Sequence, residues 1–308
     1  MRDAFVKTLE RLSQSDNDIF LLTGDLGFKL FDSFREKYPE RFLNMGIAEP
    51  NMIGVSAGLA LSGKKVYCYS MIPFLVMRCF EHIRIDICYH NLNVRLVGVG
   101  GGFVYGLEGV THHAVEDMAI MRTLPNMTVV APGDPFEVSA CIDASVSYKG
   151  PMFIRLGRRG EPQVHSTAPD FKIGKGIILF NKGNDICLLA TGTMLSKAKI
   201  ASELLLEKDF GVTLISLHTI KPLDETLIKD CAKKYRSIFS IEEHSIVGGL
   251  GSAVAEVLSE NCYNGIFKKI GLPDEFNHYV GRAEYLHQKY GLVPESIADN
   301  ITKLIKKA

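Results

Sequence analysis

The sequence predicts an α/β protein of two doubly wound α/β domains, each with a mainly parallel sheet covered by helices. Short β-branched runs alternate with stretches whose apolar residues recur three and four positions apart, as in strands followed by amphipathic helices. The alternation stops over residues 157–173, a polar segment with two prolines that we interpret as an interdomain linker. The 308 residues, of which 46% are hydrophobic, are enough for two cores.

The first half is expected to open with a helix over residues 1–16, where charged and apolar residues alternate. The strands expected after it are 19–23, 65–69, 94–99, 128–131 and 152–155. The expected helices are 51–61, 74–90, 114–122 and 135–147. Turn residues support these boundaries, because Ser62-Gly63 and Pro125-Asn126 each follow the end of a helix.

The second half repeats the α/β pattern without repeating the sequence. The strands expected there are 186–190, 212–216, 237–241 and 266–270. The expected helices are 195–207, 224–235, 250–259 and 294–306. Strands that alternate with helices in this way favour a second parallel sheet.

Composition and charge argue against several classes of protein. Lys and Arg together number 35, as do Asp and Glu, so no charge excess attracts nucleic acid or an anionic membrane. No apolar run approaches the roughly 18 residues that span a bilayer, and the first residues have no signal-peptide core. The seven cysteines are scattered and include no CxxC pair, which indicates reduced thiols in a cytoplasmic protein rather than disulfides or a zinc site.

Glu49 lies where a short strand is expected to end and an apolar helix to begin. Taken alone, this position is explained by helix electrostatics, because a first-turn acid complements the helix dipole and Pro50 suits the first turn. The helix that follows is rich in glycine and alanine, which allows its backbone to pack closely against another element. Neither feature by itself implies that Glu49 takes part in catalysis.

A long glycine-rich loop, residues 98–113, follows the strand expected at 94–99. Ligands gather at the carboxyl ends of strands in open α/β sheets, so this loop is well placed for binding. It does not fit the dinucleotide pattern G-x-G-x-x-G, because the sixth position is Phe103 or Tyr105. Four of its side chains offer acid–base or hydrogen-bonding groups: Glu108, Thr111, His112 and His113. Adjacent histidines in a loop are more often solvated or structural than catalytic.

Two further segments place charged residues at the ends of expected strands. Three arginines follow or end the strand at 152–155: Arg155, Arg158 and Arg159. Their guanidinium groups either bind phosphate or carboxylate or lie in a solvated linker entrance. Glu242, Glu243 and His244 precede the glycine-rich turn 248–251. The helix after that turn could hold an anion at its amino end, although tight packing of the turn is the favoured interpretation.

Taken together and in order, these segments resemble the transketolase family of thiamine-diphosphate enzymes. The resemblance is carried by YPERF and GIAE within residues 38–49, GLEGVTHH at 106–113, LPNMTVVAPGD at 124–134 and TIKPLD at 219–224. It covers almost the whole chain. It implies a thiamine-diphosphate pyrimidine-binding domain over residues 1–165 and a transketolase C-terminal domain over residues 172–308.

The resemblance reaches only the later part of the family pattern. Family members bind the cofactor diphosphate through a metal held by a GDG segment and a downstream pair of asparagines, whereas GDL at 24–26 and GDP at 133–135 have no such pair after them. The resemblance therefore implies the C-terminal subunit of a split transketolase. It also implies a partner, the N-terminal transketolase subunit, which carries the diphosphate-binding domain with its Mg²⁺ or Ca²⁺. Two chains of each kind would form a heterotetramer.

On the cofactor side, Glu49 matches the family glutamate that hydrogen-bonds a ring nitrogen of the pyrimidine. A carboxyl group there favours the imino form of the 4′-amino group, which then takes the proton from thiazolium C2. Phe74, Met77 and Phe80, three residues apart on one face of the expected helix, fall where the family places residues around the pyrimidine. Met77 replaces a residue that is usually aromatic, so a thioether would pack on the ring instead.

On the substrate side, His112 matches the histidine of the G-x-T-H segment, which lies near the reacting oxygens as a proton donor or acceptor. Arg158 matches an arginine that holds the phosphate end of the substrate. Glu108 replaces an aspartate that contacts a sugar hydroxyl, and residues 98–100 lack a second phosphate-contacting histidine. Both departures concern the substrate, so sugars or sugar phosphates are expected and a modified sugar remains open.

The implied function is transfer of a two-carbon ketol unit, glycolaldehyde, from a ketose or ketose phosphate to an aldose. Two alternatives use a 2-oxoacid donor: a deoxyxylulose-phosphate-synthase-like subunit and the β-subunit of a 2-oxoacid dehydrogenase. The first of these families carries an arginine just after the strand before the glycine-rich loop, and residues 98–102 offer none. The second requires a lipoyl carrier. A non-catalytic subunit that kept the fold is a third alternative, against which Glu49 argues, because a helix start needs no acid there.

Overall fold

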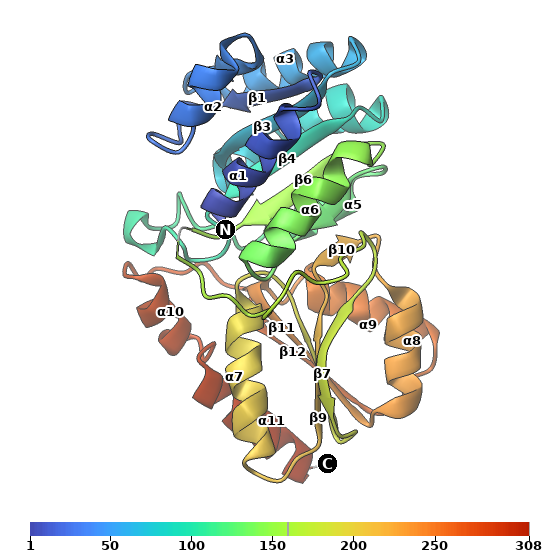
Figure 1. The fold of residues 1–308 in the computed structure, drawn as a ribbon. Helices are drawn as coiled ribbons and strands as arrows, with labels where there is room; N and C mark the ends of the chain where they lie inside the picture. Colours follow the sequence, from blue (N-terminus) through green and yellow to red (C-terminus); the bar gives the residue numbers. More distant parts are fainter. Residues whose placement is uncertain (159, 308) are drawn as a thin grey trace.

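The computed structural model describes residues 1–158 and 160–307 and contains two α/β domains stacked end to end (Figure 1). The N-terminal domain, drawn blue to green, is built on a seven-stranded sheet, and the C-terminal domain, yellow to red, on a five-stranded sheet. Helices cover both faces of each sheet, and all but one strand pairing in each sheet is parallel. The fold class predicted from the sequence is confirmed.

The N-terminal sheet has the strand order β10-β5-β6-β4-β3-β1-β2. Its strands are β1 (Ile19–Thr23), β2 (Phe42–Asn44), β3 (Lys65–Met71), β4 (Val94–Val99), β5 (Thr128–Val130), β6 (Met152–Leu156) and β10 (Thr219–Lys221). The central strands β3, β4 and β6 are almost continuously buried, as expected for a parallel sheet covered on both faces. Their carboxyl ends lie at one edge of the sheet, where the loops that carry the candidate residues begin.

Helices α1 (Arg2–Ser13) and α6 (Pro135–Ser147) pack against one face of this sheet through an apolar cluster that includes Phe5 and Val138. The short helix α2 (Asp32–Lys37) packs into the same cluster through Phe34, and the opposite face is covered by α3 (Glu49–Leu61) and α5 (Asp117–Thr123). Capping residues in the sequence explain where α6 begins. Asp134 caps α6 by accepting the N–H of Glu137 at 2.9 Å, and a proline follows it in the first turn.

The single helix expected to follow β3 is broken. It consists of a π-helical turn, a short α-helix and a second π-helical turn, which span Pro73–Met77, α4 (Phe80–His82) and Ile83–Tyr89. The N–H of Arg78 bonds to the carbonyl of Pro73, five residues earlier, at 3.1 Å, and this widens the turn. A widened turn rotates the residues after it about the helix axis. The face expected to be common to Phe74, Met77 and Phe80 is therefore not formed.

The C-terminal sheet has the strand order β12-β11-β8-β9-β7, with only β7 antiparallel. Its strands are β7 (Ile177–Lys182), β8 (Ile186–Ala190), β9 (Val212–Ser216), β11 (Ser237–Ser245) and β12 (Ile266–Leu272). The helices of this domain are α7 (Met194–Leu206), α8 (Glu225–Lys234), α9 (Leu250–Glu260), α10 (Ala283–Lys289) and α11 (Pro294–Lys307). The sequence did not predict the edge strand β7 or the short helix α10.

The two domains form one body. Strand β10 belongs in sequence to the second half, yet it pairs antiparallel with β5 at the edge of the N-terminal sheet. Apolar residues of β8 and β9 belong to the same core cluster as residues of β3 and β4. Side chains from both domains therefore meet at their junction. In the described ranges, no helix is both long and apolar enough to cross a membrane.

Candidate functional site

Glu49 begins α3 beside the carboxyl ends of β1, β2 and β3, and only 1% of the residue is exposed. A buried carboxylate is costly unless it is paired, and two side chains pair it here. The hydroxyl of Ser70, near the end of β3, donates to Oε1 at 3.2 Å. The guanidinium of Arg78 donates to Oε2 at 3.1 Å. The carboxylate is thereby held in one orientation at the edge of the sheet.

Arg78 and Phe74 form a unit beside this carboxylate. The guanidinium carbon of Arg78 lies 4.7 Å from the centroid of the Phe74 ring, within the range of a cation–π contact. The side chain of Arg78 is 47% exposed, so its position can adjust to a ligand. The sequence analysis missed Arg78. The only signal there was a charged residue directly after the apolar run 73–77, four positions from Phe74.

His112 reaches the same place from the glycine-rich loop. Its ring meets that of Phe74 edge to face, with 5.2 Å between centroids, and lies 6.4 Å from the ring of Tyr105. The hydroxyl of Thr111 lies 2.9 Å from Nδ1 of His112, which orients the half-buried ring. The structure thus brings together Glu49, Phe74 and His112, three residues that the sequence predicted for one site. We call them, with Arg78, the Glu49 cluster.

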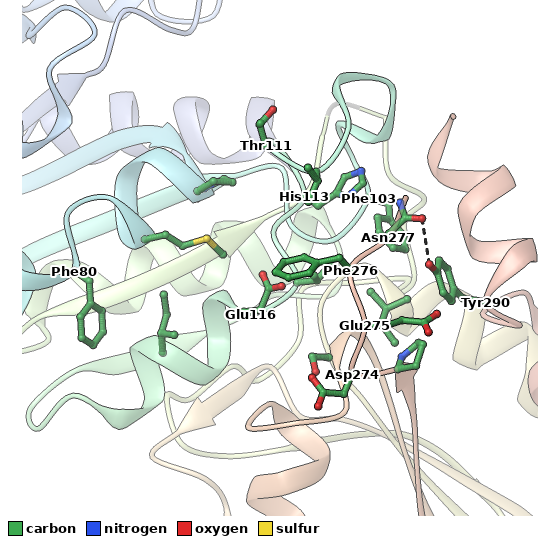
Figure 2. A pocket seen from close by; sticks show the side chains of 18 residues that line it. Phe80, Phe103, Thr111, His113, Glu116, Asp274, Glu275, Phe276, Asn277 and Tyr290 are labelled. Atoms are coloured by element: carbon green, nitrogen blue, oxygen red, sulfur yellow. Dashed lines mark hydrogen bonds between the residues drawn. The ribbon is translucent and has the colours of Figure 1, made fainter. Parts of the chain in front are cut away.

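Met77 and Phe80 lie apart from this cluster. Both line a cavity of about 760 Å³ at the junction of the two domains, and Phe74 and His112 are not among its lining residues. Figure 2 shows Phe276 projecting into this cavity from the C-terminal domain. The separation follows from the π-helical turn, which rotates Met77 and Phe80 away from the direction in which Phe74 points.

The same cavity has polar groups in a mostly apolar wall. Burial lowers the pKa of His113, which keeps its imidazole neutral near pH 7. Burial, with Asp117 nearby, raises the pKa of Glu116. On the opposite wall, the hydroxyl of Tyr290 donates to the side-chain oxygen of Asn277 at 3.1 Å (Figure 2). The cavity therefore borders the Glu49 cluster without being part of it.

Glu108 and Arg158, the two candidates for substrate contact, lie at the surface. Glu108 ends a single turn of 3-10 helix, Gly106–Glu108, and is exposed. Arg158 is also exposed, and its Nη2 donates to Oε1 of Glu284 in α10 at 2.9 Å. The ion pair links the linker entrance to the C-terminal domain. The third arginine of this segment, Arg159, lies outside the described residues.

Of the two alternatives left open from the sequence, Arg155 follows the first: it binds a carboxylate, which belongs to the chain itself, and it does not lie in a solvated linker entrance. It is 3% exposed, and its Nε donates to Oδ2 of Asp117 at 2.7 Å. Its Nη2 donates to the backbone carbonyls of Ala114 at 2.8 Å and Glu243 at 3.0 Å. A guanidinium with this set of buried partners serves to join the two domains.

The amino end of α9, after the glycine-rich turn, is occupied by a carboxyl group of the chain itself. Glu242 is fully buried and accepts the N–H groups of Leu250 and Gly251, each at 2.7 Å. Burial raises the pKa of Glu242 to about 7, although these two hydrogen bonds act in the opposite direction. The helix end is therefore closed to an external anion, as the favoured interpretation of tight packing predicted.

Comparison with known proteins identifies both domains. Residues 1–162 match the family described as transketolase, pyrimidine binding domain, and residues 174–297 match the family described as transketolase, C-terminal domain. The chain is 40% identical to the putative transketolase C-terminal section of Methanocaldococcus jannaschii, over 100% of this chain and 96% of that protein. It is 37% identical to a 6-deoxy-6-sulfo-D-fructose transketolase subunit of a Clostridium species, over 96% of this chain and 92% of that subunit.

A related synthase is similar over part of its length only. The 1-deoxy-D-xylulose-5-phosphate synthase of Shouchella clausii is 34% identical over 98% of this chain, which spans 48% of that protein. Among solved structures, a split-gene transketolase, described as an inactive β4 tetramer, is 38% identical with a TM-score of 0.88. That match covers 98% of this chain and 96% of the other. The chain therefore belongs to the transketolase family, among the C-terminal subunits of split transketolases.

Proposed function

We propose that this chain is the C-terminal subunit of a thiamine-diphosphate-dependent transketolase that transfers a two-carbon ketol unit, glycolaldehyde, from a ketose or ketose phosphate to an aldose. The observation that carries the proposal is the Glu49 cluster. A buried, oriented carboxylate, an aromatic ring and an imidazole lie together at the carboxyl ends of the parallel strands, where α/β proteins bind ligands.

The residues of this cluster fit the pyrimidine ring of thiamine diphosphate. Glu49 offers an acceptor for a ring N–H, and Phe74 offers an aromatic surface for packing. Gly24 leaves room beside the buried carboxylate, because a Cβ at this position would lie 3.4 Å from Oε1 of Glu49 and 3.0 Å from Oγ of Ser70. In our proposal Glu49 and Phe74 hold the ring, while Met77 and Phe80 close the side next to the cavity.

Glu49 would move a proton at the pyrimidine ring nitrogen. When bound, thiamine diphosphate supplies the nucleophilic carbon that ketol transfer requires. Ser70 and Arg78 orient the carboxyl group of Glu49, so little reorganisation is needed when it shares a proton with the ring. The half-exposed Arg78 can keep its bond to Oε2 while a ligand approaches Oε1.

His112, Glu108 and Arg158 would contact the sugar. With Nδ1 engaged by Thr111, His112 would use Nε2 to exchange a proton with a substrate oxygen. Glu108 would accept a hydrogen bond from a sugar hydroxyl. Arg158 would bind an anionic substrate end, either a phosphate or a sulfonate of the kind that the name of the Clostridium relative implies.

Arg158→Ala is expected to raise KM for a phosphorylated ketose roughly tenfold with little change in kcat, because a charge-assisted contact to a remote group contributes mainly to binding. Steady-state kinetics with xylulose 5-phosphate as the probe donor test this. Glu284→Gln, which removes the present partner of Arg158, is the control and should not raise KM. An unchanged KM in Arg158→Ala would show that Arg158 does not contact the substrate.

An exposed face of α3 supports the need for a partner chain. Gly54 and Gly58 are exposed, and a Cβ at either position would meet nothing within 4 Å. Leu61 on the same helix and Ile47 before it are also exposed. A smooth apolar surface next to Glu49 suits close packing against another subunit.

We infer that the partner is the N-terminal transketolase subunit, which would hold the cofactor diphosphate and its Mg²⁺ or Ca²⁺. The M. jannaschii relative is called a C-terminal section, and the solved β4 tetramer of a split-gene transketolase is called inactive. Both descriptions support a division of the active site between two chains. Two chains of each kind, related by closed twofold symmetry, would give a heterotetramer with two sites.

The alternative donors remain distinguishable by assay. A deoxyxylulose-phosphate-synthase-like subunit would use pyruvate, and a dehydrogenase β-subunit would use a 2-oxoacid with a lipoyl carrier. Similarity to the synthase spans about half of that protein, whereas similarity to the transketolase subunits extends over nearly their whole length. The absence of an arginine in residues 98–102 also favours a ketose donor.

Reconstitution tests the proposal. The purified chain is mixed with a candidate N-terminal subunit that has the GDG segment and the downstream asparagine pair, and the mass of the complex is measured. Transfer from xylulose 5-phosphate to ribose 5-phosphate, with pyruvate as the competing donor, is then followed in the presence of thiamine diphosphate and Mg²⁺. We expect a heterotetramer active with the ketose donor. Activity only with pyruvate would overturn the proposed donor class.

A further inference from the structure

The loop that carries Glu108, Thr111 and His112 is closed at its base by a small backbone bridge. Gly102 and Ala114 form an isolated antiparallel pair, in which the N–H of Gly102 donates to the carbonyl of Ala114 at 2.8 Å and the return bond is 3.1 Å. We call residues 102–114 the substrate loop. Its position relative to the Glu49 cluster depends on what holds this base.

Glu243, near the carboxyl end of β11 in the C-terminal domain, holds one side of the base. Its Oε1 accepts the backbone N–H of Phe103 at 2.7 Å and lies 2.6 Å from Nε2 of His287. Its Oε2 accepts the hydroxyl of Thr193 at 2.7 Å. Nδ1 of His287 in turn contacts the Nζ of Lys197. The imidazole of His287 therefore lies between Glu243 and Lys197 and links the two side chains.

The carboxylate of Glu243 is charged, and both of its oxygens have hydrogen-bond partners. Burial alone would raise the pKa of Glu243, but the adjacent His287 and the hydrogen bonds from Phe103 and Thr193 lower it to about 2. The residue is 2% exposed. A charged acceptor makes stronger hydrogen bonds than a neutral one, so the N–H of Phe103 is firmly held.

Arg155 holds the other side of the base. Its Nη2 donates to the carbonyl of Ala114 and also to the backbone carbonyl of Glu243. The two ends of the substrate loop are therefore bonded to two buried charged residues, one from each domain, and those two residues are bonded to each other. We call Arg155 and Glu243 the loop clamp.

The first residues of the substrate loop pack tightly against the clamp. Gly102 has a φ of +67°, and a Cβ there would lie 2.1 Å from Cδ of Glu243, so only glycine fits so close to the carboxylate. The next residue, Phe103, is buried in the core of the C-terminal domain and stacks on Tyr290 with 5.7 Å between ring centroids. The N-terminal end of the substrate loop is thus anchored in the C-terminal domain.

We propose that Glu243 is a positioning residue for the transfer reaction: the C-terminal domain uses it to hold the substrate loop so that His112 faces the donor sugar. The proposal rests on the function proposed above. It assigns the C-terminal domain a part in substrate recognition, although none of its own side chains in the clamp reaches the Glu49 cluster. Glu243 acts only through the backbone of Phe103.

The adjacent residue provides a matched control. Glu242 is also a buried carboxylate of β11 that accepts backbone N–H groups, but its partners are Leu250 and Gly251 at the start of α9. Alanine at either position removes a buried carboxylate and leaves N–H groups unpaired, so both variants should lose stability. Only the Glu243 variant should disturb the substrate loop. The comparison therefore separates positioning from general destabilisation.

Three measurements on the reconstituted complex test the proposal. In Glu243→Ala, relative to Glu242→Ala, kcat/KM for the ketose donor should fall at least about tenfold, which corresponds to about 1.4 kcal/mol. Hydrogen–deuterium exchange of the backbone within residues 103–113 should become faster. Proton exchange at C2 of the bound cofactor, which depends on Glu49, should stay unchanged. Glu243→Gln keeps the acceptor for Phe103 and should restore most of the donor kcat/KM.

Each outcome bears on the proposal. Equal donor kinetics and equal loop exchange in Glu243→Ala and Glu242→Ala would overturn it, as would a loss of C2 exchange that matches the loss of turnover. If Glu243→Ala does not fold, Thr193→Val removes one partner of the carboxylate and should produce the same changes to a smaller extent. A wild-type complex without ketol transfer would contradict the proposed function, whereas the loop-exchange comparison would still decide the role of the clamp.

Discussion

Replacing Glu49 with glutamine is expected to slow proton exchange at C2 of the bound cofactor by roughly a hundred- to ten-thousand-fold, the usual range for a general acid–base group. An amide cannot share a proton with the pyrimidine nitrogen as a carboxyl group does. The side chain keeps its size, and Ser70 can still donate to its oxygen, so folding should be nearly unchanged. The measurement is C2 exchange in the complex with the partner subunit, followed by NMR in D₂O.

The alternative explanation of Glu49 predicts a different result. If this residue only complements the dipole of α3, the substitution costs a few tenths of a kcal/mol of stability and leaves exchange intact. Glu81→Gln, at an exposed acid in the following helix, is the control for a change of charge nearby. An exchange rate within about tenfold of the wild type, in a folded and cofactor-loaded complex, would remove the catalytic role.

Replacing His112 with alanine is expected to lower turnover of the ketose donor by roughly a hundredfold or more, because a proton donor near the reacting oxygens is lost. Exchange at C2 should be preserved, since Ser70 and Arg78 still orient Glu49. The two substitutions should therefore give different results. Glu49→Gln should slow both C2 exchange and donor turnover, whereas His112→Ala should slow donor turnover alone. Stopped-flow measurement of donor consumption by the loaded complex gives the turnover.

The histidine prediction also has a control in the chain. His90 is an exposed histidine at the end of the second π-helical turn, and His90→Ala should match the wild type. A fall in C2 exchange in His112→Ala as large as that in Glu49→Gln would mean that His112 acts on the cofactor instead. Unchanged donor turnover would exclude it from the reaction.

The fold class and most helices and strands could be predicted from the sequence because their signals are local. Strand β1 and helix α6 match their expected bounds, since alternating patterns and turn residues delimit them. Strand β10 was not expected, because three residues show no periodicity and only the neighbouring β5 makes them a strand. The edge strand β7 was missed because it lies half-exposed after the polar linker.

The candidate site was predictable where motifs are continuous and unpredictable where distant residues meet. Glu49 and His112 lie in short segments that resemble the family. Arg78 belongs to the site because it bonds to Glu49, which lies 29 positions earlier in the chain, and the spacing of residues 74–80 alone does not indicate that contact. The π-helical turn was also not predictable, because helical spacing read from sequence assumes 3.6 residues per turn. Glu243 accepts the N–H of Phe103, a residue 140 positions earlier in the sequence, and no local pattern can indicate such a contact.

The central claim is that this chain supplies the pyrimidine half of a divided cofactor site. Titration calorimetry with thiamine diphosphate and Mg²⁺, on the chain alone and on its complex with the N-terminal subunit, tests it most directly. The charged diphosphate makes the strongest contacts, so the complex should bind at least about a hundredfold more tightly, a difference of about 2.7 kcal/mol. Equally tight binding by the isolated chain would contradict the claim.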